Sequence, residues 1–296
     1  MKVKDFAAGE YHSVALDSQG GVWTWGYGGK KGMFSWMFTQ EVGALGHGDI
    51  APYFHPKKVQ FFSQNGLKVK TIAAGNYHSV ALCDDGNLYS WGVGLYGVLG
   101  NGSNSYALNP TIIDEFKFLK DQAEEDGIEF SIVKIDAADD YTAVVLSDGQ
   151  LLVWGKNDRG QMGVGAGLGI DLVECEVTPK EVDFQQALPE ADKKEPVIIT
   201  DVMTGSRTMM ATDSKGRVFK TGLKIDYVPK MINFNRKRME KVKQLACGMR
   251  YYAVLDDENN IHCFGKIFKD KATEEYDGFE IFDGEKIFEQ GKILDL

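Results

Sequence analysis

One short string recurs along this chain and limits what the chain can fold into. Residues Lys4–Leu16 read KDFAAGEYHSVAL, and residues Lys70–Leu82 read KTIAAGNYHSVAL, 66 residues further on. A third copy is KIDAADDYTAVVL at Lys134–Leu146, and weaker copies follow at Asp201–Thr212 and Gln244–Leu255. Self-similarity of this kind is the signature of repeat architectures, so the chain is predicted to consist of stacked copies of one unit.

Each copy continues with the same sequence elements. A turn leads into a short strand that ends in an aromatic residue and Gly, and the turns Asp85-Gly86 and Asp148-Gly149 are two-residue hairpin signals. A glycine string follows, GALGHG, GVLGNG or GQMGVG, and then a Pro that opens a further strand. Each copy is therefore predicted to form one four-stranded antiparallel sheet.

Several residues occupy matching places in successive copies and are predicted to have structural roles. The matching glycines are Gly9 and Gly75, with Asp139 at that place in the third copy. His12 and His78 share one position with Thr142, Thr208 and Tyr251. A residue type that recurs once per sheet favours a buried hydrogen-bonding role over a catalytic one. The tryptophans Trp25, Trp91 and Trp154 precede a Gly and are predicted to form large wedges between sheets, with Thr221 and Phe264 at this place in the last two copies.

A four-stranded sheet of this kind cannot cover its own faces, so the copies must stack on one another. Radial stacking gives a β-propeller, which protects its sheet edges by closing into a ring. The 34 glycines against 7 prolines suit short strands joined by tight turns. The predicted fold class is therefore all-β, with the propeller as its architecture.

The pattern AAGxxHSxAL, D-G, a strand ending in W-G, GxLGxG and P-x-x-V resembles the repeat of the regulator of chromosome condensation family. The resemblance implies a propeller of seven blades, whereas this chain has five recognisable repeats, at about 2–62, 67–118, 130–184, 197–234 and 240–290. Lys292–Leu296 resembles the start of a sixth. We therefore expect one domain over residues 1–296 that is incomplete, with further sequence or another chain supplying the missing blades. A closed ring of five blades is the alternative.

Inserts in the repeats are candidates for added function, because loops on a rigid scaffold carry function. The first repeat has an apolar insert containing Met33, Phe34, Trp36, Met37 and Phe38. This segment either folds back onto its sheet or forms an exposed partner surface. The acidic insert at Phe116–Phe130 is interpreted as a solvated loop or short helix, with a docking site for a basic partner as the alternative. The insert at Gln185–Pro196 is interpreted as a flexible excursion.

No set of residues in the sequence indicates a catalytic, cofactor or metal site. Gly92–Gly97 fits the dinucleotide fingerprint G-x-G-x-x-G, but turn residues follow where that motif needs a helix. His47, His55 and Asp49 share one loop without the regular spacing of metal ligands, and a structural role is favoured for them. The four cysteines lie far apart, without a Cys-x-x-Cys pair, which argues against a zinc site.

The sequence favours a protein-binding function. The net charge of −10 argues against nucleic acid as a partner, and no apolar run is long enough to span a membrane. We expect a non-enzymatic interaction scaffold, a subunit or assembly factor of a multi-subunit complex, that is intracellular rather than secreted and lies in the mitochondrial matrix or the cytoplasm. The resemblance implies two further possibilities. One is guanine-nucleotide exchange on a small GTPase, which the best-known family member performs on Ran; the other is a mitochondrial role, as in some relatives.

Overall fold

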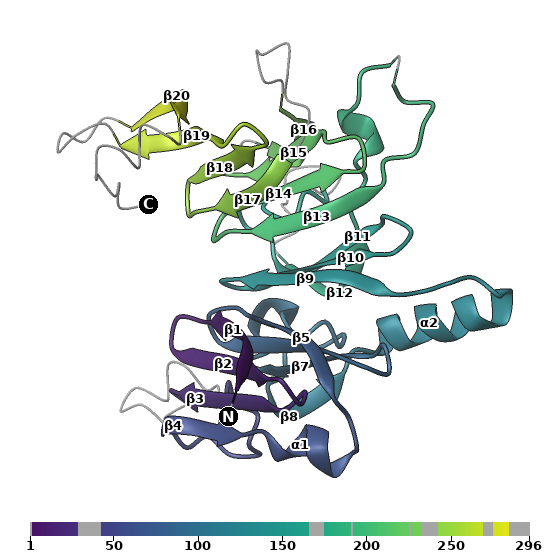
Figure 1. Ribbon diagram of the computed structural model, residues 1–296, viewed down its shortest axis with the longest axis vertical. Helices are drawn as coiled ribbons and strands as arrows, with labels where there is room; N and C mark the ends of the chain where they lie inside the picture. Colours follow the sequence, from purple (N-terminus) through teal and green to yellow (C-terminus); the bar gives the residue numbers. More distant parts are fainter. Residues whose placement is uncertain are drawn as a thin grey trace. The chain divides into compact units, whose positions relative to one another are not determined.

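The computed structural model contains five four-stranded antiparallel sheets, which confirms the predicted all-β class and the five repeats (Figure 1). The described residues are 2–28, 43–165, 175–190, 192–224, 226–232, 242–268 and 275–283. They form two compact units. The first contains residues 1–158 and 166–182, and the second contains residues 159–165 and 183–296. The expected start of a sixth repeat at Lys292–Leu296 lies outside the described residues.

The first unit holds three sheets, whose strands pair in chain order. The first sheet consists of β1 (Val3–Ala8), β2 (His12–Asp17), β3 (Val22–Gly26) and β4 (Tyr53–Lys58). The second consists of β5 (Val69–Ala74), β6 (His78–Cys83), β7 (Leu88–Gly92) and β8 (Ala107–Ile112), and the third of β9 (Ile132–Ala138), β10 (Tyr141–Leu146), β11 (Leu151–Lys156) and β12 (Cys175–Glu181). Helix α1 (Gln60–Gln64) follows the first sheet and α2 (Asp114–Asp126) follows the second.

The second unit holds the remaining two sheets. The fourth sheet consists of β13 (Ile199–Thr204), β14 (Thr208–Asp213), β15 (Val218–Gly222) and β16 (Asp226–Met231). The fifth consists of β17 (Val242–Cys247), β18 (Tyr251–Asp256), β19 (Asn260–Phe268) and β20 (Glu275–Asp283). Whether residues 1–296 form a single domain stays a prediction.

The second strand of each sheet is largely buried. Every residue of β6 and of β10 is buried, on both faces of the strand. The outermost strand β4 has only half-buried and exposed residues. Alternation of apolar and polar residues is therefore absent from these strands. For β6, the first sheet makes contact through His12 and Ser79, and the third sheet makes contact through His78 and Thr142.

The hairpin turn before the third strand is longer than predicted. In the second sheet, Cys83 N–H donates to the Asn87 carbonyl (3.0 Å) and Gly86 N–H donates to the Cys83 carbonyl (3.1 Å). The turn therefore has three residues, Asp84, Asp85 and Gly86, and Gly86 has a φ of 84°. A type I turn followed by a glycine of positive φ is the usual form of a three-residue hairpin loop, so the two-residue prediction is wrong.

The third repeat is aligned one residue earlier than its string suggests. Tyr141 pairs with Gly155, as His12 pairs with Gly26 and His78 with Gly92. Tyr141 therefore occupies the histidine position, and the prediction of Thr142 at that position is wrong. By the same register, Ala138 replaces the glycine and Asp139 lies in the hairpin turn, with a φ of 44°. The repeated lysines at Lys70 and Lys134 had suggested a false alignment.

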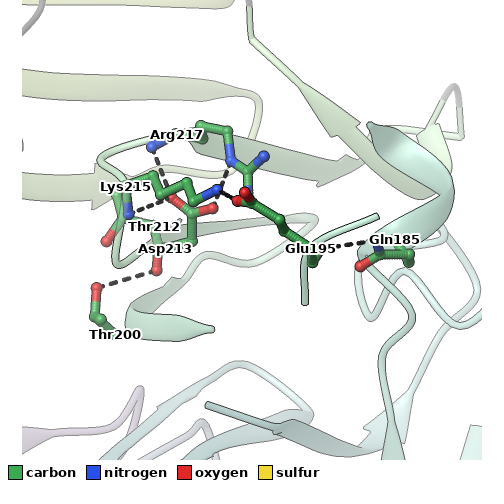
Figure 2. A network of polar contacts seen from close by, with 7 residues as sticks. All are labelled: Gln185, Glu195, Thr200, Thr212, Asp213, Lys215 and Arg217. Atoms are coloured by element: carbon green, nitrogen blue, oxygen red, sulfur yellow. Dashed lines mark hydrogen bonds and ion pairs between the residues drawn. The ribbon is translucent and has the colours of Figure 1, made fainter. Parts of the chain in front are cut away.

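A buried aspartate at the end of β14 organises the turn that follows it. Asp213 accepts hydrogen bonds from the Lys215 and Arg217 amides and from Arg217 Nε (2.6 Å), as Figure 2 shows. Lys215 also pairs with Glu195, and Gln185 Nε2 donates to the Glu195 carbonyl (2.9 Å). The insert interpreted as a flexible excursion is therefore joined to the fourth sheet through Glu195, and the bond from Gln185 to Glu195 closes it on itself.

The glycine loops are residues 43–48, 97–102 and 160–165, and each is hydrogen-bonded to the sheet that follows it in the chain. In the first of them, the Ala44 carbonyl accepts a hydrogen bond from Trp91 Nε1 of the second sheet (3.0 Å). Gly46 faces the same indole, and a Cβ added to it would lie 2.8 Å from Trp91 Nε1. We call this contact, an indole on a glycine with its N–H bonded to the loop carbonyl, the indole joint.

The indole joint recurs between the second and third sheets. Trp154 Nε1 donates to the Val98 carbonyl (2.8 Å), and Gly100 faces the ring. In the second unit a threonine replaces the tryptophan: Thr221 Oγ1 donates to the Gln161 carbonyl (2.6 Å) at the corresponding place. Thr221 therefore retains the hydrogen bond of the indole joint but lacks its large buried ring.

We expect Trp91→Ala and Trp154→Ala each to lower the free energy of unfolding by about 3–5 kcal/mol, because both indoles are fully buried. Trp25→Ala should cost clearly less, because the Trp25 side chain is only half-buried. Urea unfolding followed by circular dichroism measures the difference. Equal losses of unfolding free energy for all three variants would contradict the claim that a fully buried indole stabilises the protein more than a half-buried one.

We expect Gly100→Ala to destabilise the protein more than Gly66→Ala. Both glycines have a positive φ, of 67° and 69°, so both substitutions strain the backbone. A Cβ at Gly100 would also lie 2.8 Å from Trp154 Nε1, whereas a Cβ at Gly66 would meet nothing within 4 Å. The extra loss for Gly100→Ala should be roughly 1–3 kcal/mol in the same unfolding experiment. Similar losses of unfolding free energy for the two variants would show that the Trp154 indole moves aside to make room for the added Cβ.

Candidate protein-interaction site

The recurrent histidines are buried and hydrogen-bond to the next sheet. His12 Nε2 lies 2.8 Å from Ser79 Oγ, and His78 Nε2 lies 2.9 Å from Thr142 Oγ1. Gly9 and Gly75 leave room for these rings: a Cβ at Gly9 would lie 2.6 Å from His12 Cε1. Each glycine and histidine pair therefore lies at the hairpin that joins the first and second strands of its sheet: Gly9 and His12 in the first sheet, Gly75 and His78 in the second.

Burial lowers the pKa of His12 to about 4 and that of His78 to about 3, so both rings are neutral at pH 7. The Trp25, Trp91 and Trp154 side chains lie opposite Ser13, Ser79 and Thr142 respectively, which is the same register in three sheets. The structure thus gives the predicted repeat positions a place in the connections between sheets.

His47, in the first glycine loop, and Asp49, just after it, form hydrogen bonds within the first repeat. His47 Nε2 lies 3.0 Å from Thr24 Oγ1. Asp49 accepts hydrogen bonds from Tyr53 Oη (2.8 Å) and from the Ala51 amide (3.0 Å). Throughout the described ranges, His, Cys, Asp and Glu side chains form no group of three that could hold a metal ion.

The glycine string after β7 leads into a short 3-10 turn, Leu95–Gly97, in which Tyr96 has a φ of 61°. A dinucleotide fingerprint would open an α-helix at this place. The local geometry therefore differs from that of a dinucleotide site.

Three tyrosine side chains gather at the surface of the first unit, a group that was not predicted from the sequence. The Tyr11 and Tyr77 rings are stacked with centroids 4.9 Å apart, and Tyr27 lies 6.3 Å from Tyr11. Tyr11 is 45% exposed and Tyr27 is 37% exposed. We call these three residues the tyrosine cluster. The available signal was the tyrosine that precedes the repeated histidine in the first two copies.

Charged groups border the tyrosine cluster. Burial, followed by a hydrogen bond with Tyr11, raises the pKa of the Tyr77 phenol, and the nearby carboxylates of Glu10 and Asp140 act in the same direction. Burial also raises the pKa of Asp140, although Lys156 lies 3.7 Å from its carboxylate and opposes this shift. The Tyr77 phenol therefore stays neutral and can serve as a hydrogen-bond donor beside an acidic rim.

The structure describes the acidic insert but not the apolar insert. Met33, Phe34, Trp36, Met37 and Phe38 lie outside the described residues. The acidic insert forms α2, in line with the short-helix interpretation. Phe116 is buried and its ring lies 5.7 Å from that of Trp154, whereas Phe118 is 62% exposed. Among the helices that the structure describes, none is long and apolar enough to cross a membrane.

Comparison with known proteins identifies the repeats. The Regulator of chromosome condensation (RCC1) repeat family matches residues 39–82 in one profile and residues 3–31, 69–106 and 132–161 in a second. The chain is 30% identical to the mitochondrial RCC1 domain-containing protein RUG3 of Arabidopsis thaliana over 206 residues, covering 70% of this chain and 39% of that protein. It is 29% identical to the human E3 ubiquitin-protein ligase HERC2 over 269 residues, covering 86% of this chain and 5% of the ligase. It is also 28% identical to the ultraviolet-B receptor UVR8 of Arabidopsis thaliana, covering 90% of this chain and 53% of the receptor.

Solved structures share the fold. Human WBSCR16 superposes with a TM-score of 0.66 at 21% identity, over 89% of this chain and 62% of that one. Prp20p from Saccharomyces cerevisiae, described with binding properties to Gsp1p and histones, superposes with a TM-score of 0.57 at 17% identity, over 89% of this chain and 72% of that one. The sheets of the present chain are thus blades of a β-propeller fold. The chain is built from repeats of the regulator of chromosome condensation type.

We expect the protein to lose stability as the pH falls below about 6.5, because of its buried histidines. In the unfolded chain a histidine takes up a proton near pH 6.5, whereas His12 and His78 stay neutral in the fold down to about pH 4 and pH 3. Between these values the unfolded state binds more protons, so acid favours unfolding. The loss should be on the order of 2 kcal/mol for each histidine between pH 7 and pH 4.5.

Urea unfolding at pH 7, 6, 5 and 4.5 measures this effect. His78→Asn should flatten the dependence on pH relative to the unsubstituted protein, and His55→Gln, on an exposed strand, is the matched control. An unchanged pH dependence in the His78→Asn variant would contradict the assignment.

Proposed function

We propose that this protein is a non-enzymatic interaction scaffold that binds a protein partner through the tyrosine cluster. The observation that carries the proposal is the exposed stack of Tyr11 on Tyr77, with Tyr27 beside it. Tyrosine is enriched at protein interfaces because its ring buries a large area while its hydroxyl forms a hydrogen bond.

The backbone beneath the tyrosine cluster supports such a role. Tyr11 and Tyr77 directly precede His12 and His78, which are buried and bonded to the following sheet. A rigid hairpin loses little conformational entropy when it binds, which favours affinity. The acidic rim contributed by Glu10 and Asp140 suits a partner with a basic surface.

We further propose that the scaffold is a subunit or assembly factor of a larger complex, in the mitochondrial matrix or the cytoplasm. The similarity to RUG3, a protein named as mitochondrial, supports the first compartment. The chain spans 5% of HERC2 and about half of UVR8, so the activities of those proteins concern much longer chains.

Guanine-nucleotide exchange on a small GTPase is the second candidate function. It is supported by the fold shared with Prp20p, which is described with binding to Gsp1p. Fold alone does not supply the loops that displace a nucleotide. We therefore expect no exchange on Ran. Release of a fluorescent GDP from Ran should proceed at its spontaneous rate with this protein present, and acceleration by several orders of magnitude would favour the second candidate.

We expect the double substitution Tyr11→Ala with Tyr77→Ala to abolish most partner binding. Affinity purification from the native cell, with quantified co-purifying proteins, measures the effect. The recovery of the specific partner should fall on the order of tenfold or more, because a buried tyrosine at an interface contributes strongly to affinity. Phe118→Ala removes an aromatic side chain from α2 that is 62% exposed, against 45% for Tyr11, and is the control. Equal recovery with both variants would contradict the proposed surface.

A further inference from the structure

The tyrosine cluster presents aromatic ring surface to a partner. Tyr77 covers one face of the Tyr11 ring, with 16° between the two ring planes, and Tyr11 is still 45% exposed. The Tyr77 hydroxyl is engaged in a hydrogen bond with Tyr11. The Tyr27 ring is tilted by 57° against the Tyr11 ring, so these two rings meet at an angle. The part of the cluster that is open to a partner therefore consists mainly of the rings of Tyr11 and Tyr27.

A carboxylate lies beside this ring surface. Glu10 directly precedes Tyr11 and is exposed. Burial is the main cause of the raised pKa of the Tyr77 phenol, and the negative charge of Glu10 adds to it, so the carboxylate is close to the stacked rings. Within the described ranges, Glu10 forms no ion pair. Its charge is therefore available to a partner.

Further negative charge surrounds Asp140, which also acts on Tyr77. Burial raises the pKa of the Asp140 carboxyl, Lys156 opposes this shift, and the charges of Asp139 and Asp158 reinforce it. These three carboxylates exceed the single positive charge of Lys156. The local electrostatic potential therefore attracts cations to this part of the first unit.

One lysine of the first unit already shows how a cation binds here. Lys156 Nζ lies 4.5 Å from the centroid of the Tyr96 ring and 3.7 Å from the Asp140 carboxylate. The negative face of the aromatic ring and the carboxylate both attract the ammonium group. Among the residues that the structure describes, no lysine or arginine lies over the ring of Tyr11 or Tyr27. These rings and Glu10 thus repeat the arrangement of Tyr96 and Asp140 without a cation.

We propose that the tyrosine cluster binds an arginine side chain of the protein partner. The guanidinium group lies against the exposed rings of Tyr11 and Tyr27 and pairs with the Glu10 carboxylate. This inference rests on the proposed function, because it specifies the chemistry of the partner at the same surface.

Arginine fits this surface better than lysine. A guanidinium group is planar, so it can stack on an aromatic face while its N–H groups, which lie in the plane, donate to a carboxylate. The ammonium group of lysine is a compact, strongly hydrated charge that cannot stack. Tyr11 already stacks face to face on Tyr77, and a planar cation suits such a stack.

Tri-arginine, acetylated and amidated at its ends, is the probe for this site. It is added to the full chain with carbon-13 in the tyrosine rings, and the ring resonances are followed by NMR. The Tyr11 and Tyr27 resonances, assigned with Tyr11→Phe and Tyr27→Phe, should shift saturably at millimolar peptide. Tri-citrulline has nearly the same shape without the charge and should shift neither resonance. Tri-lysine has the same charge and should bind several-fold more weakly.

Variants of the protein separate the contribution of the ring from that of the carboxylate. Tyr11→Phe keeps an aromatic face and should retain the shift of the Tyr27 resonance, whereas Tyr11→Leu should abolish it. Glu10→Gln should weaken tri-arginine binding roughly threefold. Glu125→Gln removes an exposed carboxylate from α2 and is the matched control, which should leave binding unchanged. Unchanged resonances of the buried Tyr141 and Tyr252 report that each variant remains folded.

Equal shifts with tri-citrulline or with tri-lysine, or equal effects of Glu10→Gln and Glu125→Gln, would overturn the proposal. Affinity purification with the double tyrosine variant tests the proposed function separately. If partner recovery falls in that experiment while tri-arginine shifts neither resonance, the binding surface stands and the arginine inference is wrong. If tri-arginine binds as expected while partner recovery is unchanged, only the proposed function is contradicted.

Discussion

A recurring contact, a buried indole lying on a glycine of the preceding repeat, connects the first three sheets of this protein. The ring excludes any Cβ at Gly46 and Gly100, and its N–H satisfies a carbonyl that the loop could not otherwise pair when buried. Both glycines have a positive φ, a conformation that a residue with a side chain adopts only at a cost. Tryptophan, glycine and loop conformation therefore depend on one another across each joint. Where Thr221 replaces the ring, the hydrogen bond remains as the conserved part of the contact.

The repeat period predicted the number of sheets, their strand order and the recurrence of Trp91 and Trp154 at one register. These features follow from local sequence, because each sheet is built from consecutive strands. The register of the third repeat did not follow, because Lys134 suggested an alignment that the pairing of Tyr141 with Gly155 contradicts. The acceptors of the indole N–H groups were also beyond sequence reasoning, since they are backbone carbonyls of another repeat.

In the candidate site too, some features could be predicted from the sequence and others depend on contacts between repeats. The buried role of His12 and His78 could be inferred from their recurrence, whereas the stack of Tyr11 on Tyr77 depends on two hairpins being brought side by side. Tyrosine at a repeated position is usually a core residue, so its exposure was visible only in the fold. The hairpin that carries each tyrosine is held by the adjacent histidine, which links the stability of the repeat to the surface proposed for binding. The predictions for Met33 to Phe38 stay untested.

Hydrogen exchange of the indole N–H groups, followed by nitrogen-15 NMR of labelled tryptophan, tests the account most directly. Trp91 and Trp154 should exchange slowly, with protection close to that of global unfolding, because their N–H groups are buried and bonded to Ala44 and Val98. Trp25 should exchange orders of magnitude faster, because its side chain is only half-buried. Comparable exchange at all three positions would contradict the claim that the indole joint connects the first three sheets.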